Sequence, residues 1–265
     1  MRSQARGNVN PALLSALFSI YDTDDSKIIT LEEFQVQYVS PPGSDIETLT
    51  DTQARILFYL VDIDKSNGIN ENEFDEYVQK MAKLGEGSSQ SEMWSQGDIH
   101  NALFYVFDKN GNGVQSIDEF ITYLEEVEAS NEESSSHESL LSKSYGHKFM
   151  FNLADLNSNG QVTKKEYLFY LTQASQYEKE NGLLGHWTRK QVNKALFKTI
   201  DDNDNNLVSI DELNKLMLAG GNILSVQELQ LFWNLVDTNG DGKITYYEIA
   251  KIMDSGCRKW IEDLN

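Results

Sequence analysis

A twelve-residue segment rich in oxygen-bearing side chains occurs six times in the 265-residue chain, and it constrains the fold more than any other feature. Every copy begins with Asp and ends with Glu. The copies occupy residues 22–33, 62–73, 108–119, 155–166, 201–212 and 237–248. Repetition at this spacing indicates an array built from one supersecondary unit.

The sixth segment, Asp237–Glu248, shows what chemistry the spacing suits. A hard divalent cation of the size of Ca²⁺ takes about 6–8 oxygens at about 2.3–2.6 Å. Side chains at positions 1, 3 and 5, a backbone carbonyl at 7, a direct or water-bridged contact at 9 and a bidentate Glu at 12 would supply them. Gly242 at position 6 permits the sharp turn, because it has no Cβ to clash at positive φ. A polar turn without a metal is the alternative, but the spacing favours a cation site.

The same six positions give the candidate ligands of every segment. In the first three segments they are Asp22, Asp24, Ser26, Ile28, Thr30, Glu33, Asp62, Asp64, Ser66, Gly68, Asn70, Glu73, Asp108, Asn110, Asn112, Val114, Ser116 and Glu119. In the last three they are Asp155, Asn157, Asn159, Gln161, Thr163, Glu166, Asp201, Asn203, Asn205, Leu207, Ser209, Glu212, Asp237, Asn239, Asp241, Lys243, Thr245 and Glu248.

Apolar residues recur at helical spacing on both sides of each segment. Four residues before each one lies an aromatic: Phe18, Phe58, Phe104, Phe151, Phe197 and Trp233. Directly after position 12 lie Phe34, Phe74, Phe120, Tyr167, Leu213 and Ile249. Such periodicity predicts a helix before and after each loop, with one apolar face turned into a core. We therefore expect an all-α protein.

These loops and their flanks resemble the EF-hand superfamily over nearly the whole chain. Six such units in about this length are similar to the hexa-EF-hand group of large calbindins, secretagogin and calretinin. The resemblance implies six helix-loop-helix units in three pairs, each pair with a short two-stranded antiparallel β link at loop position 8. It also implies an intracellular calcium buffer that can act as a sensor.

The spacing of the loops suggests how they pair. The first and second loops start 40 residues apart and the fifth and sixth 36 residues apart, so each of these couples forms a natural pair. The third and fourth loops then pair by elimination. We expect pairs at residues 1–83, 92–175 and 187–265, joined by linkers at 84–91 and 180–185, with a polar loop at 131–139. Trp94 and Trp187 lie just beyond the linkers and are expected to dock them on neighbouring helices.

The six loops differ in their expected affinity for calcium. Lys27 occupies the turn position of the first loop and must adopt a positive φ there, so this loop is the candidate for weakest or empty. Asn67 and Asn206 hold the same position in two other loops, and Asn tolerates this conformation better. Gln115 at position 8 is expected to loosen the pairing of the third and fourth loops. Carboxylate count places the loop at Asp237 near the strong end.

Composition narrows the classes of partner and location. With 42 acidic and 22 basic residues the formal net charge is −20, which disfavours nucleic acid and anionic lipid and favours cations or basic peptides.

No apolar run approaches the length of about 18–20 residues that a membrane span needs. Cys257 is the only cysteine, which fits a reducing compartment. The run Leu13–Phe18 is short for a signal peptide, and the last residues are not an ER-retention signal. We therefore expect a cytoplasmic monomer rather than a secretory six-handed protein of the reticulocalbin–calumenin type.

The resulting hypothesis is a calcium buffer that binds up to six Ca²⁺, with Mg²⁺ as a competitor. The alternative is a calcium sensor that exposes an apolar groove to a target helix or peptide, although six methionines are few for a promiscuous groove. An enzyme is not expected. The four histidines are scattered and are not grouped as zinc ligands would be, and Cys257 has no evident His partner. The glycines of the loops are explained as turn residues and not as a phosphate-binding loop.

Overall fold

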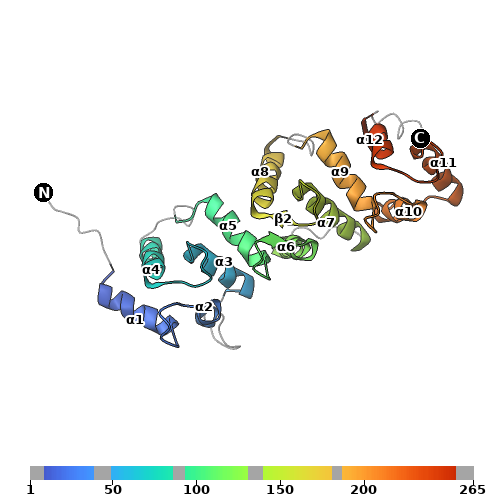
Figure 1. Cartoon of the computed structure of the whole chain (residues 1–265). Coiled ribbons are helices and arrows are strands. Elements are labelled where there is room, and N and C mark those ends of the chain that lie inside the picture. Colours follow the sequence, from blue (N-terminus) through green and yellow to red (C-terminus); the bar gives the residue numbers. More distant parts are fainter. Residues whose placement is uncertain (1–8, 39–48, 86–92, 131–139, 181–186, 255–265) are drawn as a thin grey trace. The chain divides into compact units, whose positions relative to one another are not determined.

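The computed structural model describes residues 9–38, 49–85, 93–130, 140–180 and 187–254, and these ranges contain twelve helices and two short strands (Figure 1). The chain divides into two compact units, a first one at Met1–Gly111 and a second one at Asn112–Asn265. The three-pair domain division stays a prediction. The expected loop at 131–139 and most of both linkers lie outside the described residues. No helix in the described ranges is long and apolar enough to cross a membrane.

A helix precedes and follows each of the six loops. The first unit contains α1 (Pro11–Tyr21), α2 (Leu31–Tyr38), α3 (Asp51–Val61), α4 (Glu71–Gly85) and α5 (Gln96–Phe107). The second contains β1 (Val114–Gln115), α6 (Ile117–Ser130), α7 (Leu140–Ala154), β2 (Val162–Thr163), α8 (Lys164–Glu180), α9 (Arg189–Ile200), α10 (Ile210–Ala219), α11 (Val226–Val236) and α12 (Tyr246–Asp254).

The helix before each loop ends at the loop's first Asp. The N–H of Asp62, for example, donates to the carbonyl oxygen of Phe58 at 2.8 Å, which closes the last helical turn. The same bond from position 1 to the aromatic residue four positions earlier occurs at all six loops, at 2.8–2.9 Å. The aromatic residue thus packs in the core while its carbonyl sets the point at which the loop begins.

Each loop turns through two residues in the left-handed region. At position 6 these are Lys27, Asn67, Gly113, Gly160, Asn206 and Gly242, as expected from the sequence. At position 4 they are Asp25, Lys65, Gly111, Ser158, Asp204 and Gly240, which ligand spacing alone does not predict. Gly111 and Gly240 were the available signal, since Gly is the residue most often found at positive φ.

Backbone bridges join loops at position 8. Ile29 and Ile69 exchange two hydrogen bonds of 2.9 Å, and Val208 and Ile244 form a second antiparallel bridge. Strand β1 pairs with β2 in antiparallel register, with Gln115 opposite Val162. Gln115 does not prevent this pairing, since the ladder here extends over two residue pairs, and the expectation that it loosens the pairing stays a prediction. The bridge uses backbone groups, so it does not depend on the side chain being apolar.

The aromatic residues that flank the loops form the core, as predicted. In the first unit Phe18, Phe34, Phe58 and Phe74 are buried around the bridge at Ile29, with the Phe34 and Phe58 rings 5.7 Å apart. In the second unit two groups occur. Phe120 packs on Phe151 with ring centroids 5.7 Å apart, and Phe197, Trp233, Val208 and Ile244 belong to a separate buried cluster.

Trp94 and Trp187 dock on neighbouring helices, as predicted. Trp94 packs against the core of the first unit, and the ammonium of Lys80 from α4 lies 5.7 Å from its ring centroid. Trp187 is buried, with its ring 6.1 Å from that of Tyr170 in α8. Each Trp is followed by a helix N-cap, Ser95 or Thr188, whose side chain forms a capping box. The linker ends are therefore fixed to the helices on both sides.

Candidate metal sites

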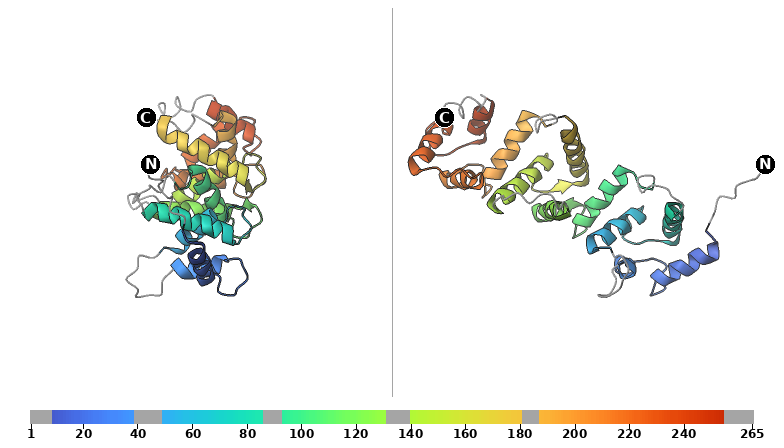
Figure 2. Two further views of the ribbon diagram at one scale, coloured as in Figure 1. Left: turned by 90° about the vertical axis from the view of Figure 1, so that its left-hand side faces the viewer. Right: turned by 180° about the vertical axis from the view of Figure 1, so that it is seen from behind.

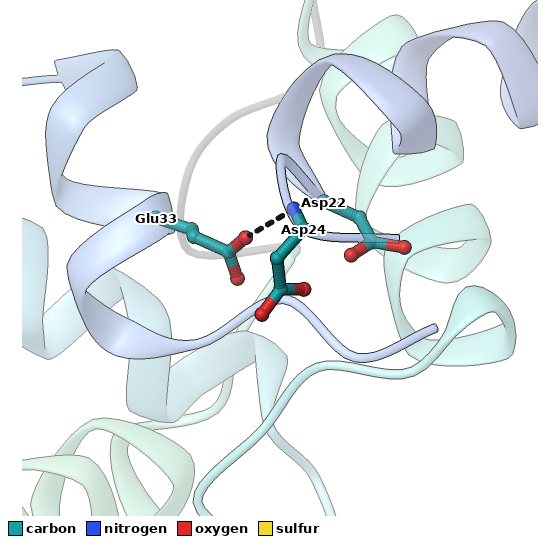
Figure 3. A group of neighbouring side chains, drawn as sticks. All are labelled: Asp22, Asp24 and Glu33. Carbon is teal, nitrogen blue, oxygen red and sulfur yellow. Dashed lines mark hydrogen bonds between the residues drawn. The ribbon is translucent and has the colours of Figure 1, made fainter. Parts of the chain in front are cut away.

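Three carboxylates gather in each of the first two loops. The oxygens of Asp22, Asp24 and Glu33 lie within 4.8 Å of one another. In Figure 3 the Glu33 carboxylate, from α2, faces the loop and accepts the Asp24 N–H at 3.4 Å. In the second loop a matching group consists of Asp62, Asp64 and Glu73. Three acidic groups at such separations suit a hard cation that takes oxygen ligands.

The first Asp of the loop holds the turn with both carboxylate oxygens. Asp22 accepts the N–H of Ser26 at 2.9 Å on Oδ1 and the N–H of Lys27 at 3.0 Å on Oδ2. The same pair of bonds, from positions 5 and 6 to position 1, recurs in the second, fourth, fifth and sixth loops. All six position-1 aspartates are buried. These hydrogen bonds within the chain therefore fold the loop around its first ligand.

The last Glu of the loop joins its two ends. In the fifth loop Glu212 accepts the N–H of Asp202 at 2.9 Å on Oε1 and the N–H of Ser209 at 2.8 Å on Oε2. Equivalent bonds hold Glu33, Glu73 and Glu248, and in the fourth loop the first partner is Asn157 at position 3. Positions 1 and 12 thus form a carboxylate frame, by which we mean these two side chains and the backbone N–H groups they accept.

Position 9 has a second role, which ligand spacing does not reveal. The Ser209 hydroxyl caps α10 by accepting the N–H of Glu212, and Glu212 bonds back to Ser209, so the two form a capping box. The hydroxyls of Thr30, Ser116, Thr163 and Thr245 likewise donate to the carboxylate of the Glu three residues later. The signal was in the sequence, because Ser or Thr followed three residues later by Glu is a capping-box pattern.

The pKa values of two framing carboxyls move in opposite directions. Burial raises the pKa of Asp62 to about 6, and the Lys65 charge and the N–H groups of Asn67 and Ser66 only partly oppose this. Burial also acts to raise the pKa of Glu33, but hydrogen bonds from Thr30 and Thr23 outweigh it and lower the pKa to about 2. Near neutral pH Glu33 is therefore ionised, while Asp62 is close to its titration range.

We predict that calcium binding at the second loop releases a proton near pH 6. Cation binding requires the Asp62 carboxylate, so below its pKa of about 6 each ion displaces a proton, and affinity falls by about tenfold per pH unit. Since this folded pKa exceeds the ordinary Asp value of 3.8, protonation stabilises the metal-free fold as the pH falls from about 6 to about 4. Calorimetric titrations in buffers of different ionisation enthalpy measure the number of protons released when calcium binds.

The control for the proton release is Asp62→Asn, which removes the titrating group but leaves the other loops intact. Proton release near pH 6 should be smaller in this variant than in the wild-type chain. Equal proton release in the wild-type chain and in this variant would contradict the assignment to Asp62.

The remaining loops bring their predicted ligands together to different extents. In the fourth and fifth loops the side-chain amides of Asn157 and Asn203 donate to the position-12 Glu at 3.0 Å. In the sixth loop Asp241 accepts the Asn239 side chain and the Lys243 N–H. Among the described residues, the close groups of three carboxylates are those of the first and second loops. The predicted ranking of affinities stays a prediction.

The third loop crosses the boundary between the two units. Asp108 and Asn110 belong to the first unit, and the ligands from Asn112 onward belong to the second. In the second unit the Glu119 carboxylate accepts the N–H of Ser116 at 2.9 Å, and the N–H of Glu119 donates to the Ser116 hydroxyl. In the first unit Asp108 is buried at the end of α5.

Lys27 adopts the positive φ that was expected of it, +70°, and its ammonium pairs with Asp25. We predict that Lys27→Gly raises the melting temperature of the metal-free chain by a few degrees, because Gly removes the Cβ that makes this conformation unfavourable. Lys27→Ala is the matched control, since it loses the same ion pair but keeps the Cβ. Thermal unfolding in chelator measures both. If the Ala variant gained as much as the Gly variant, backbone strain would not be the cause.

Family models match three segments of the chain, and each segment contains at least one of the loops. Models described as an EF-hand domain pair match residues 190–254 and residues 43–80, and a model described as an EF hand matches residues 148–168. The comparison with curated protein sequences gives no match. Among solved structures, the chain is similar to calcium-loaded apo-aequorin from Aequorea victoria, with 21% identity and a TM-score of 0.24. That match covers 58% of this chain and 85% of the other.

Proposed function

We propose that this chain, in which EF-hand models match residues 43–80, 148–168 and 190–254, is an intracellular calcium buffer with six EF-hand units in three pairs. The units are the six loops with the helices before and after them, and the pairs are those joined by the bridges at position 8. Up to six Ca²⁺ bind, and Mg²⁺ competes for the same oxygens. A cytoplasmic, monomeric and non-enzymatic protein is part of this proposal.

The observation that carries the proposal is the carboxylate frame. A carboxylate at position 1 and another at position 12 occupy the same places in all six loops. In five of them the described hydrogen bonds of both side chains already hold the loop closed. A buffer needs several competent sites in one chain, and repetition of the frame supplies them. In a sensor a single responsive pair would be enough.

The residues of each loop would hold the cation by replacing its water ligands with oxygens. Position 1 is preorganised because its two oxygens are fixed by the turn. Hydrogen bonds hold the pKa values of Glu33, Glu212 and Glu248, at position 12, below the usual Glu range. A cation would give such a carboxylate a stronger partner than the N–H groups it now accepts. Ca²⁺ tolerates irregular oxygen cages, whereas Mg²⁺ needs a near-octahedral site and retains water, so Ca²⁺ is the favoured ion.

A calorimetric calcium titration in the presence of Mg²⁺ tests the proposal by counting sites. We expect at least four bound Ca²⁺ per chain, in more than one affinity class. Glu→Gln at position 12 of one loop at a time should remove one site each, while Gln173→Glu in α8, outside the loops, should remove none. Fewer than four sites in the wild-type chain would leave the buffer without support.

A sensor is the second candidate, and three exposed apolar side chains favour it. Ile223, Val226 and Leu231, at and before α11, are 84%, 85% and 64% exposed. Apolar side chains at such exposure are suited to contact another protein. Binding of an apolar dye with and without calcium distinguishes the two functions. A large calcium-dependent rise in dye binding would favour the sensor over the buffer.

A further inference from the structure

Helices from the fourth and fifth loops pack directly on each other in the second unit. Helix α7, which leads into the fourth loop, lies against α9, which leads into the fifth, and also contacts α10 (Figures 1 and 2). The side-chain amide of Asn152 donates to the hydroxyl of Thr199 at 3.0 Å. Thr199 is 2% exposed, and its own hydroxyl donates to the carbonyl of Ala195. We call this contact, together with an ion pair between Lys148 and Asp202, the α7–α9 junction.

The junction reaches a side chain of the fifth loop. The ammonium of Lys148, in α7, lies 3.2 Å from the Asp202 carboxylate, which follows the position-1 residue of the fifth loop. The N–H of Asp202 donates to Glu212, the position-12 residue of that loop. At its other end α7 closes on the fourth loop through the bond from Asp155 to Phe151. Helix α7 therefore leads into the fourth loop at one end and contacts a side chain of the fifth loop through Lys148.

A cavity borders the junction. It measures about 290 Å³ and is lined by Ser144, Tyr145, Lys148, Asp202 and Lys215. Lys215, from α10, lies 3.3 Å from the same Asp202 carboxylate.

The first unit repeats this arrangement at equivalent positions. Arg55 precedes Asp62 by seven residues, as Lys148 precedes Asp155. Its guanidinium donates at 3.0 Å to the carbonyl of Val106, near the end of α5. The ring of Tyr59, in α3, also stacks on that of Tyr105, in α5, with centroids 5.8 Å apart. A basic residue seven positions before an even-numbered loop thus contacts the fifth loop itself in the second unit, and the helix that leads into the third loop in the first unit.

We propose that calcium occupancy of the fourth loop is coupled to that of the fifth through the α7–α9 junction, so that communication runs between pairs and not only within them. The proposal rests on the calcium sites assigned above. Closure of the fourth loop on its ion acts on the end of α7, and the junction passes the displacement to Asp202 and the frame of the fifth loop. Coupling of this kind is reciprocal, because it is a free energy shared by the two sites.

The test compares calcium affinities of single loops in the full chain by NMR. The backbone amide of Asn206, which donates to Asp201, reports the fifth loop, and that of Gly160, which donates to Asp155, reports the fourth. Glu166→Gln disables the fourth loop. We expect it to change the calcium affinity of the fifth loop by at least about fivefold. Glu212→Gln should change the affinity of the fourth loop by the same factor.

Junction variants then test the route. In Asn152→Ala and in Lys148→Met, disabling one loop should change the calcium affinity of the other by a factor close to one. Two variants are used in case one of them fails to fold. Lys215→Met is the matched control, since it removes the other lysine of Asp202 but lies in α10, and it should leave the coupling unchanged.

The outcomes separate the two proposals. If neither loop bound calcium in the wild-type chain, the proposed function would fail and the coupling with it. If both loops bound calcium with affinities that did not depend on each other, the coupling alone would be overturned. Coupling that persisted in both Asn152→Ala and Lys148→Met would overturn the assignment to this junction.

Discussion

Removal of calcium is expected to lower the melting temperature of the chain by more than about 10 °C. A ligand that binds only the folded state adds about 4 kcal/mol at 1,000 times its dissociation constant, and several loops contribute. For chains of this size about 1 kcal/mol corresponds to roughly 2–4 °C. The metal-free chain also carries a net charge of −20, with the position-1 aspartates buried in their loops. Bound Ca²⁺ relieves this repulsion as well as adding binding free energy.

Thermal unfolding followed by circular dichroism, in calcium and in chelator, measures the effect. Sodium chloride at high concentration with chelator is the control, because it screens charge without filling the loops. It should recover only a small part of the calcium effect. Equal melting temperatures in calcium and chelator would contradict the prediction, and full recovery by salt would show that repulsion alone was responsible.

The second large effect is expected from Phe34→Ala, which should destabilise the first unit by about 3–5 kcal/mol. Phe34 is 0% exposed, and its ring lies 5.7 Å from that of Phe58 and 4.8 Å from that of Tyr38. The substitution leaves a cavity beside the Ile29–Ile69 bridge, where both loops of this unit meet. We therefore expect weaker calcium binding at the first and second loops as well.

Val36→Ala is the matched control, because Val36 lies in the same helix, α2, but is 71% exposed. Its effect should stay within about 0.5 kcal/mol. Denaturant unfolding in chelator gives both values. Similar unfolding midpoints for the two variants would mean that the ring of Phe34 is not part of the cooperative core.

Local rules were enough to predict much of the fold and the loop positions. The aromatic residue four positions before each loop and the apolar residue after position 12 are buried, because helical periodicity alone places them on one face. The positive φ at position 6, including that of Lys27, follows from the turn that six ligands around one ion require. The second, fourth, fifth and sixth loops, which spacing alone picked out, lie in segments that EF-hand models match.

Some features of the loops were in the sequence but do not follow from ligand spacing. The second left-handed residue at position 4 was visible as Gly111 and Gly240. The capping box between positions 9 and 12 was visible as Thr or Ser followed three residues later by Glu. Both features belong to the loop without its ion, whereas ligand spacing describes only the occupied loop.

Other features were decided by the tertiary structure. The raised pKa of Asp62 depends on burial, and the contact of Asn152 with Thr199 joins residues 47 positions apart. The division into units at residue 111 falls inside a loop that the sequence treats as one element. The sequence by itself determined the six acidic loops and their apolar flanks, because ligand spacing and helical periodicity act over a few residues. Which helices pack together, and hence which loops can affect one another, depends on the shapes of whole helix faces, and only the folded chain brings those faces into contact.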